Sequence, residues 1–384
     1  MFPTIKTLAD LTPFIEGNNQ FRIDRQANGF TVVCYMLKDE DTFGGANADF
    51  KAECRGITFN PDGTIASRAL HKFSNVGEGA DSQPDMIPWD QICRVMDKRD
   101  GSMVHPVMIN GEVVFKTKKS FTSAEAIAAT EFLKADPEKY SWVHGMMSLG
   151  FTPIFEWTSP RFPIVLVYEK DELTLLQIRQ NITGEYVTLP QHWDVIAEGC
   201  PFPIVENIVH QFQVPLDFDD QGQVLDYRVD WEAMRDAAME RIGIEGWIVQ
   251  AVDGRMWKIK TKWYCDLHHS VTFTRYRDVA RSVLLDQSDD LKAAFSLTGR
   301  STQPIVEIEK EIFGTIDAAK ISVAAIVSFI EEEKMSVKDA ALRFREYPLF
   351  GQIMRTVRGQ NVDWIDWYSK THLDVAHSLE VIPV

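Results

Sequence analysis

The sequence lacks the features of a secreted, membrane-spanning or zinc-binding protein. Its five cysteines are widely spaced and include no C-x-x-C pair, which argues against a disulfide framework and a zinc site. The first residues lack the basic and apolar segments of a secretion signal, and the longest apolar-rich stretch, 321–330, is too short for a membrane span. We therefore expect a cytoplasmic protein with reduced cysteines and no membrane partner.

The chain also lacks an excess of positive charge. Its 40 Lys and Arg residues face 56 Asp and Glu residues, so the formal net charge is −16. A protein that coats nucleic acid needs positive charge over its contact surface, so any polyanion site here must be local. Two basic runs, 116–119 and 255–262, meet that description, although an isolated basic run is more often a solvated strand face.

The residue pattern predicts an α+β protein of two domains. From about residue 20 to 265, short β-branched and aromatic runs alternate with turn dipeptides, with helical interludes near 124–150 and 190–240. Beyond residue 270, apolar residues recur at helical spacing, and Ser336 opens a capping-box sequence. We therefore predict a domain of antiparallel sheets with flanking helices over 1–268 and an all-α domain over 269–384.

One turn dipeptide predicts a hairpin that carries lysines. Asn110-Gly111 separates two strand-like runs and is the strongest short signal for a two-residue hairpin loop. In that register Lys116 and Lys118 point the same way.

A second dipeptide, Asp253-Gly254, predicts a hairpin that gathers charges. A two-residue loop pairs Val249 with Lys258 and Trp247 with Lys260. That register places Glu245, Lys258 and Lys260 on one face, and it places Ile248, Trp257 and Ile259 on the other. One carboxylate beside two ammonium groups suits a charged ligand better than a core.

Lys98, in the run Lys98-Arg99-Asp100-Gly101-Ser102, is the candidate nucleophile. A lysine attacks only as the free amine, so burial or neighbouring cations must lower its pKa, and the lysines of the two hairpins are candidates for that role. Asp100-Gly101 can form a tight turn that lets the backbone approach a phosphate. Alone the run is weak evidence, because K-x-D-G occurs by chance in about one chain in ten of this length and also fits a surface turn.

The other runs strengthen this interpretation because of their order. They are Glu53-Cys54-Arg55-Gly56-Ile57, Lys72-Phe73-Ser74-Asn75, the Lys98 run, Phe155-Glu156-Trp157, Glu245-Gly246-Trp247-Ile248-Val249 and Lys258-Ile259-Lys260-Thr261-Lys262-Trp263-Tyr264. This order resembles motifs I, Ia, III, IV and V of the covalent nucleotidyltransferases, and more narrowly the bacteriophage RNA ligase 1 family. The resemblance covers about residues 30 to 295, and it departs at Ser74, where a second aromatic residue is expected.

The resemblance implies an ATP-dependent RNA ligase (EC 6.5.1.3 type) with an ATP-grasp-like nucleotidyltransferase domain. Lys98 would attack the α-phosphate of ATP and form a lysyl-adenylate. AMP would then pass to an RNA 5′-phosphate, and an RNA 3′-hydroxyl would expel it. The implied cofactors are ATP and Mg²⁺, with Mn²⁺ as a substitute.

The resemblance also implies a role for each matching residue. Charge on the α-phosphate would be neutralised by Lys258 and Lys260, the ribose would be held by Glu156, and the nucleotide and a metal would be positioned by Glu245. The ATP site would further include Tyr35, Arg55, Lys72, Asp100 and Gly101, with Arg55, Lys72 and Tyr35 on the triphosphate tail. Later steps would use Lys116, Lys118 and Tyr264, and magnesium would associate with Asp289. Tyr35 fits a half-buried strand position equally well, and Asp289 fits a carboxylate in the first turn of a helix.

The implied partner is RNA with 5′-phosphate and 3′-hydroxyl ends, in particular cleaved tRNA selected by the second domain. A separate end-healing kinase and phosphatase would supply such ends, in the cytoplasm of the host cell for a phage protein. Two alternatives stay open. A DNA ligase or an mRNA guanylyltransferase would append an OB-fold after motif V. An inactive RNA-binding scaffold would be expected to lose the nucleophile or a motif V lysine, and this chain retains them all.

Overall fold

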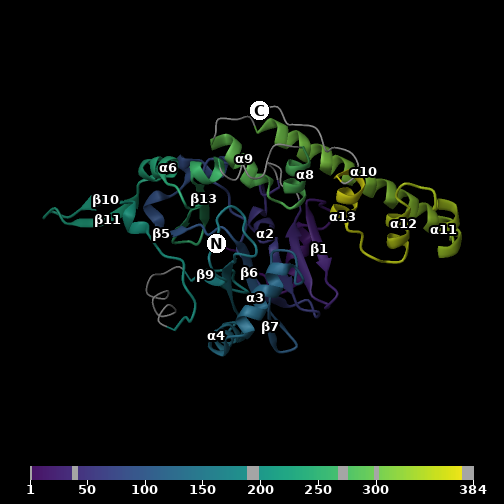
Figure 1. Cartoon of the computed structure of the whole chain (residues 1–384), viewed down its shortest axis with the longest axis horizontal. Coiled ribbons are helices and arrows are strands. Elements are labelled where there is room, and N and C mark those ends of the chain that lie inside the picture. Colours follow the sequence, from purple (N-terminus) through teal and green to yellow (C-terminus); the bar gives the residue numbers. More distant parts are fainter. Residues whose placement is uncertain (1, 37–41, 188–198, 267–275, 298–301, 374–384) are drawn as a thin grey trace. The chain divides into compact units, whose positions relative to one another are not determined.

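The computed structural model describes residues 2–36, 42–187, 199–266, 276–297 and 302–373. The chain divides into two compact units, Met1–Leu267 and His268–Val384, which are described separately (Figure 1). In the described residues every strand lies in the first unit, and the second unit contains helices. This arrangement confirms the predicted α+β class. The first unit ends one residue before the predicted domain boundary.

All strand pairs of the first unit are antiparallel. One four-stranded sheet has the order β1 (Phe21–Arg25), β2 (Thr31–Tyr35), β3 (Arg55–Phe59), β4 (Ile65–Ser67). A second has the order β7 (Glu112–Lys116), β6 (Ser102–Ile109), β8 (Phe151–Thr158), β9 (Glu172–Gln180). A three-stranded sheet has the order β13 (Met256–Lys260), β12 (Gly246–Ala251), β5 (Ile92–Asp97), and β10 (Gln213–Phe218) pairs with β11 (Val224–Val229) alone.

Helices cover the sheets that carry the largest apolar side chains. Helices α3 (Ala124–Lys134) and α4 (Pro137–Ser148) pack against the sheet of β6 to β9 (Figure 1). They enclose Phe155 and Trp157 between themselves and the sheet. The caps at Ser123 and Asp136 fix where these helices begin, and they confirm the predicted helical interlude at 124–150. Helix α6 (Trp231–Glu240) packs on β12 and β13. The other short helices are α1 (Leu8–Leu11) and α2 (Ala48–Ala52).

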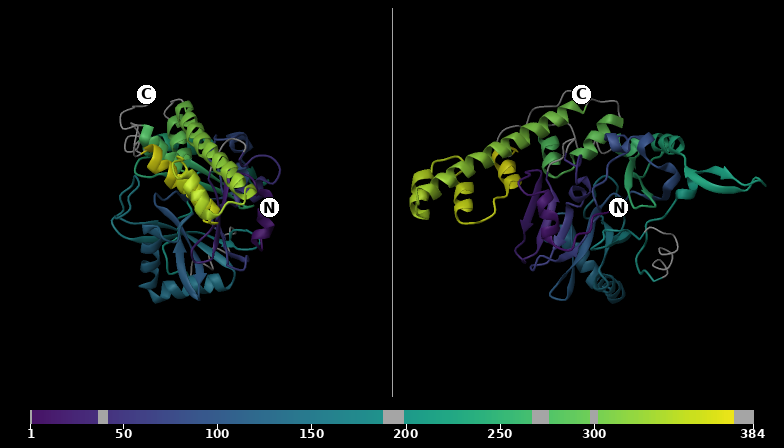
Figure 2. Two further views of the ribbon diagram at one scale, coloured as in Figure 1. Left: turned by 90° about the vertical axis from the view of Figure 1, so that its right-hand side faces the viewer. Right: turned by 180° about the vertical axis from the view of Figure 1, so that it is seen from behind.

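The predicted helical interlude at 190–240 is largely wrong. Residues 188–198 lie outside the described part of the chain. Within 199–240, α6 is the only α-helix, and Val209–Gln211 form a short 3-10 helix. The intervening residues form the β10–β11 hairpin, which extends away from α6 in Figures 1 and 2. Its second strand includes Val224, Tyr227 and Val229, and β-branched and aromatic residues favour strands.

The hairpin around Asn110-Gly111 is confirmed, but the predicted register of the second hairpin is wrong by one residue. Ile109 pairs with Glu112 across the first turn, as expected. In the second hairpin Lys258 pairs with Ile248, not with Val249. Ile248 therefore lies on the face of Lys258, where it packs beside Leu70 and Phe73.

The described part of the second unit is helical throughout. Its helices are α8 (Tyr276–Leu284), α9 (Ser288–Leu297), α10 (Gln303–Glu332), α11 (Val337–Phe344), α12 (Phe350–Val357) and α13 (Trp364–Tyr368), followed by a π-helical turn (Ser369–Leu373). The Ser336 hydroxyl accepts the Asp339 N–H at 3.2 Å, which confirms the predicted cap. Along α10, the buried residues Ile308, Ile312, Ile316 and Val323 confirm the predicted periodicity.

The apolar stretch of α10 is longer than the stretch 321–330 that the sequence indicated. An 18-residue window of this helix has a mean hydropathy of 1.6, enough to cross a membrane by length and composition alone. The core helix of a soluble protein passes the same test, and α10 packs against α8 and α12.

Candidate active site

Lys98 and Lys260 share one buried carboxylate. Lys98 directly follows β5, and its main-chain N–H donates to the Gly246 carbonyl at 2.9 Å. Its Nζ lies 2.5 Å from Glu245 Oε1, and Lys260 Nζ lies 3.1 Å from the same oxygen. The Lys98 side chain is 22% exposed, whereas those of Glu245 and Lys260 are buried. The predicted nucleophile is thus accessible, and its charged neighbours are fixed beneath it.

Two glycines allow the strands to bring these groups together. A Cβ on Gly246 would lie 2.0 Å from the Ile259 carbonyl oxygen, and the φ of Gly246 is +148°, which L side chains rarely adopt. A Cβ on Gly101 would lie 2.5 Å from the Trp157 carbonyl oxygen. Gly246 therefore permits the close approach of β12 to β13, and Gly101 permits the close approach of the Lys98 turn to β8.

Glu156 lies on β8, opposite Met103 of β6, and is buried. Burial raises the pKa of its carboxyl to about 8, Glu245 and Asp100 raise the pKa further, and the charges of Lys98 and Arg55 oppose the shift. At neutral pH this carboxyl therefore carries a proton in the unliganded protein. The site therefore contains a carboxyl group whose pKa burial shifts strongly, a feature typical of functional sites.

Several cations meet beside the first sheet. The buried Nζ of Lys118 lies 3.5 Å from the centroid of the Tyr35 ring, which places Tyr35 beside a predicted ligand-binding lysine. Burial lowers the pKa of Lys118 well below its ordinary value, and the charges of Lys119, Arg55 and Lys72 lower it further. Mutual repulsion of this kind is relieved when a polyanion binds.

The run that begins at Lys72 lies alongside β13. The Lys258 N–H donates to the Ser74 carbonyl at 3.0 Å, and the Val76 N–H donates to the Lys258 carbonyl at 2.9 Å. The Phe73 ring lies 5.6 Å from both the Arg55 guanidinium and Lys258 Nζ. Ser74 therefore contributes its main chain to this pairing, and one aromatic ring, Phe73, contacts both cations.

Asp100 is placed differently from the ATP contact that was predicted. Its buried carboxylate accepts the Tyr264 hydroxyl at 2.7 Å and the N–H groups of Val165 and Leu166 at 2.8 and 2.6 Å. Its main-chain N–H donates to the Tyr168 hydroxyl at 3.1 Å. Asp100 thus fixes Tyr264 and the segment before β9 to the Lys98 turn. Sequence reasoning missed Tyr168, which has no motif to mark it.

Lys116, which was predicted to point the same way as Lys118, is enclosed by main-chain carbonyls. Its ammonium group donates to the carbonyls of Gly56, Thr117 and Lys118 at 3.3, 2.9 and 3.1 Å, and the side chain is fully buried. Burial lowers the pKa of Lys116 to about 8. A lysine enclosed by carbonyls in this way stabilises the loop and is not presented to RNA.

The predicted metal residues lie in different units. Asp289 lies in the second unit, whereas Lys98 lies in the first. Asp289 occupies the first turn of α9, a position that fits the helix-terminus alternative. Within the residues that the structure describes, no three His, Cys, Asp or Glu side chains gather as a metal cage. Glu245 and Glu156 supply carboxylate oxygens near Lys98. This donor set fits Mg²⁺, which often takes one or two carboxylates and completes its shell with substrate phosphates and water.

Comparison with known proteins agrees with this geometry. The model of a family described as RNA ligase matches residues 53–264, which run from Glu53 to Tyr264 and include the Lys98, Glu156 and Glu245 runs. The chain belongs to the RNA ligase family. The matched residues therefore include Lys98, Glu245 and Lys260, whose contacts are described above.

Two relatives share about a quarter to a third of the aligned residues with this chain. A putative RNA ligase of Thermovibrio ammonificans is 32% identical over 198 residues, which cover 51% of this chain and 51% of that protein. RNA ligase 1 of bacteriophage TS2126 is 25% identical over 274 residues, 67% of this chain and 61% of that protein. The match therefore spans only about half to three fifths of these relatives. An archaeal ATP-dependent RNA ligase structure overlaps with a TM-score of 0.44 at 10% identity, covering 80% of this chain and 78% of that one.

Proposed function

We propose that this protein is an ATP-dependent RNA ligase that joins RNA 3′-hydroxyl and 5′-phosphate ends through a lysyl-adenylate on Lys98. The observation that carries the proposal is the accessible Lys98 ammonium, paired with Glu245 and placed beside Lys260 within the matched family region. A lysine nucleophile, a cation for the developing phosphate charge and a carboxylate near both are what adenylylation requires.

The first step forms a bond between Lys98 Nζ and the α-phosphorus and breaks the bond from that phosphorus to the bridging oxygen, so pyrophosphate leaves. Lys98 must lose a proton before it attacks, and Glu245 Oε1, at 2.5 Å, is placed to accept it. Lys260 and Lys258 then face the phosphate as charge develops. Glu156 binds the ribose hydroxyls, Arg55, Lys72 and Tyr35 bind the triphosphate tail, and Lys118 serves the later steps.

The second and third steps transfer AMP and then expel it. An oxygen of the RNA 5′-phosphate attacks the adenylate phosphorus, and the P–N bond to Lys98 breaks. An RNA 3′-hydroxyl then attacks the activated 5′-phosphorus and releases AMP. A divalent cation, Mg²⁺ or Mn²⁺, would be held by Glu245 together with the phosphates, and it would neutralise the charge of the two polyanions.

Two features favour RNA over the alternative substrates. The family match is to RNA ligases, and the described residues after 276 form helices where a DNA ligase or a capping enzyme would carry the strands of an OB-fold. We assign selection of cleaved tRNA to the helical unit, in host cytoplasm beside an end-healing kinase and phosphatase. Comparing sealing rates of a nicked tRNA and of an oligonucleotide with the same ends tests this assignment, and equal rates would contradict it.

Covalent labelling tests the proposed activity. Purified protein incubated with α-labelled ATP and magnesium should acquire one acid-labile, protein-bound AMP, and chase with 5′-phosphorylated RNA should remove it. An inactive scaffold would take up no label, and labelling by GTP in preference to ATP would indicate a capping enzyme.

Nucleotide affinity should rise with pH because of Glu156. Its pKa of about 8 means that the carboxylate needed to accept ribose hydroxyls is a minor species at pH 7. Affinity for a non-hydrolysable ATP analogue should increase about fivefold from pH 7 to pH 8, reach about tenfold near pH 9 and then level off. Calorimetric titration measures this, with Glu156→Gln as the control that should show a flatter profile. An equally steep rise in Glu156→Gln would assign the titration to another group.

A further inference from the structure

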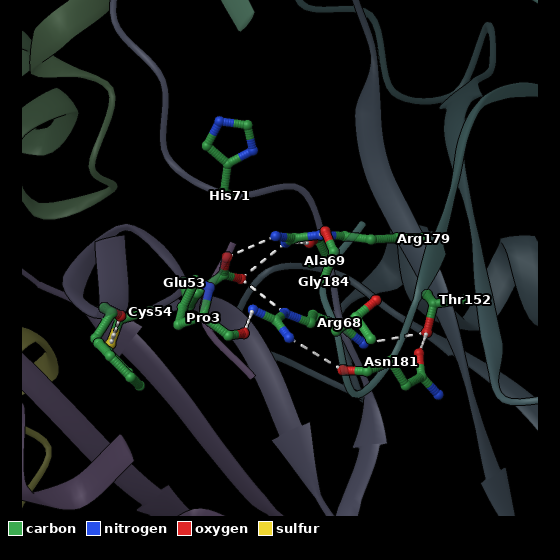
Figure 3. A network of polar contacts seen from close by, with 12 residues as sticks. Pro3, Glu53, Cys54, Arg68, Ala69, His71, Thr152, Arg179, Asn181 and Gly184 are labelled. Atoms are coloured by element: carbon green, nitrogen blue, oxygen red, sulfur yellow. Dashed lines mark hydrogen bonds and ion pairs between the residues drawn. The ribbon is translucent and has the colours of Figure 1, made fainter. Parts of the chain in front are cut away.

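A buried ion cluster lies beside the cation-rich part of the site and includes no residue of the proposed chemistry. Figure 3 shows the Glu53 carboxylate between two arginines. Arg68 Nε lies 3.0 Å from Glu53 Oε2, and the Arg179 NH1 and NH2 groups lie 2.8 and 2.5 Å from Oε2 and Oε1. All three side chains are at most 1% exposed.

The two arginines connect this carboxylate to distant parts of the chain. Arg68 donates to the carbonyls of Pro3 and Ile182 at 2.8 and 2.9 Å, and Arg179 donates to the carbonyl of Ala69 at 2.7 Å (Figure 3). The cluster carries two positive charges and one negative charge in the interior. The desolvation of Glu53 by burial is outweighed by the charges and hydrogen bonds of Arg179 and Arg68, because together they lower the pKa of its carboxyl to about 2. A buried salt bridge is nevertheless weak evidence for a role in stability alone.

The main chain around Glu53 holds all three predicted contacts of the triphosphate tail. The Ala52 carbonyl accepts the Lys72 N–H at 2.7 Å, and the Cys54 carbonyl accepts the Tyr35 N–H at 2.6 Å. The Arg55 N–H donates to the Glu53 carbonyl at 2.7 Å. Residues 52–54 therefore fix the backbone positions of Tyr35, Arg55 and Lys72 relative to one another.

We infer that Glu53 is a positioning residue for the polyphosphate of ATP, acting through Arg55, Lys72 and Tyr35 and touching no substrate. The inference rests on the proposed ligase function. Clamping of the Glu53 carboxylate by Arg68 and Arg179 prevents residues 52–54 from shifting, and a shift of about 1 Å at a positioned group can reduce a rate a hundredfold. The pairs of Arg179 with Ala69 and of Lys72 with Ala52 extend the same support to the Lys72 run.

A positioning role for Glu53 predicts different effects on adenylylation and on the sealing of RNA. The β- and γ-phosphates are present only while Lys98 reacts with ATP, and they have left before RNA is activated. Loss of the clamp should therefore impair adenylylation and spare the sealing of RNA that already carries a 5′-adenylate. A purely structural role would impair both steps together.

Glu53→Gln tests the inference, because it keeps the side-chain shape and removes the charge that both arginines bind. The apparent KM for ATP in adenylylation should rise by about tenfold or more, while sealing of pre-adenylylated RNA changes by less than about threefold. Arg68→Lys, which keeps the charge and loses the forked donors, should act in the same direction. Phe115→Leu is the matched control, since Phe115 is fully buried in the same unit and should lower the melting temperature without changing the KM.

The outcomes are distinguishable. Parallel loss of adenylylation and sealing in Arg68→Lys, or an unchanged KM for ATP in a folded Glu53→Gln, would overturn the positioning role. If Glu53→Gln fails to fold by circular dichroism, the KM of Arg68→Lys decides the question. Absence of labelling in the wild-type protein would instead count against the proposed function.

Discussion

Lys98→Ala is expected to form no covalent adduct with ATP, a loss of about a thousandfold or more in the labelling rate. No other described lysine combines the accessibility of Lys98 with its position at Glu245, because the second lysine there, Lys260, has a buried side chain. The P–N bond requires a primary amine at this point, so even Lys98→Arg, which keeps the positive charge, should fail. The measurement is α-labelled ATP uptake resolved on a denaturing gel.

The fold of Lys98→Ala should be retained. The Lys98 side chain is partly exposed, and Glu245 keeps Lys260 as a partner at 3.1 Å, so no buried charge is left unpaired. Sealing of RNA that already carries a 5′-adenylate should persist, since that step needs no new P–N bond. Labelling of Lys98→Ala at the wild-type rate would exclude Lys98 as the nucleophile.

The two hairpins show what turn chemistry predicts and where it fails. Asn110-Gly111 forms the two-residue loop that its sequence indicates. Asp253-Gly254 belongs instead to a three-residue loop, in which the Ala251 N–H donates to Arg255 and Gly254 adopts a φ of +87°. Both loops place a glycine of positive φ directly after Asn or Asp, so the dipeptide alone does not define the register. The strand partner of Lys260 is Gly246, one residue after Glu245. The Glu245 side chain is nevertheless long enough to contact Lys260 Nζ at 3.1 Å.

Contacts between distant segments were beyond sequence reasoning. Lys98, Glu156, Glu245 and Lys260 were predicted together from ordered motifs, and the structure brings them together. No local pattern marks Arg68 or Arg179 as partners of Glu53, since 15 and 126 residues separate these pairs. The same holds for the burial of Lys116, because the carbonyl of Gly56 that it contacts is 60 residues away. Pattern and spacing describe one segment at a time, whereas burial depends on all segments that pack around a side chain.

Gly246→Ala should be the most damaging single-methyl change in the site. The added Cβ would lie 2.0 Å from the Ile259 carbonyl oxygen and 2.8 Å from Lys260 Cα, both backbone atoms, and φ of +148° is strained for alanine. Either β13 moves, which displaces Lys258 and Lys260, or β12 moves, which displaces the Gly246 carbonyl that binds the Lys98 N–H. We expect destabilisation of about 3 kcal/mol or more, measured by urea unfolding, and labelling by ATP reduced at least about a hundredfold.

Gly145→Ala is the matched control for this substitution. Gly145 lies within α4, and a Cβ there would meet no atom within 4 Å. Alanine has the higher helix propensity, so Gly145→Ala should raise the free energy of unfolding by up to about 1 kcal/mol and leave labelling unchanged. If Gly246→Ala matched this control in both measurements, the close approach of β12 and β13 at Gly246 would not be required. Loss of labelling in folded Gly246→Ala, below its unfolding transition, would show that the strand contact sets the geometry of Lys98 and Lys260 as well as the stability of the sheet.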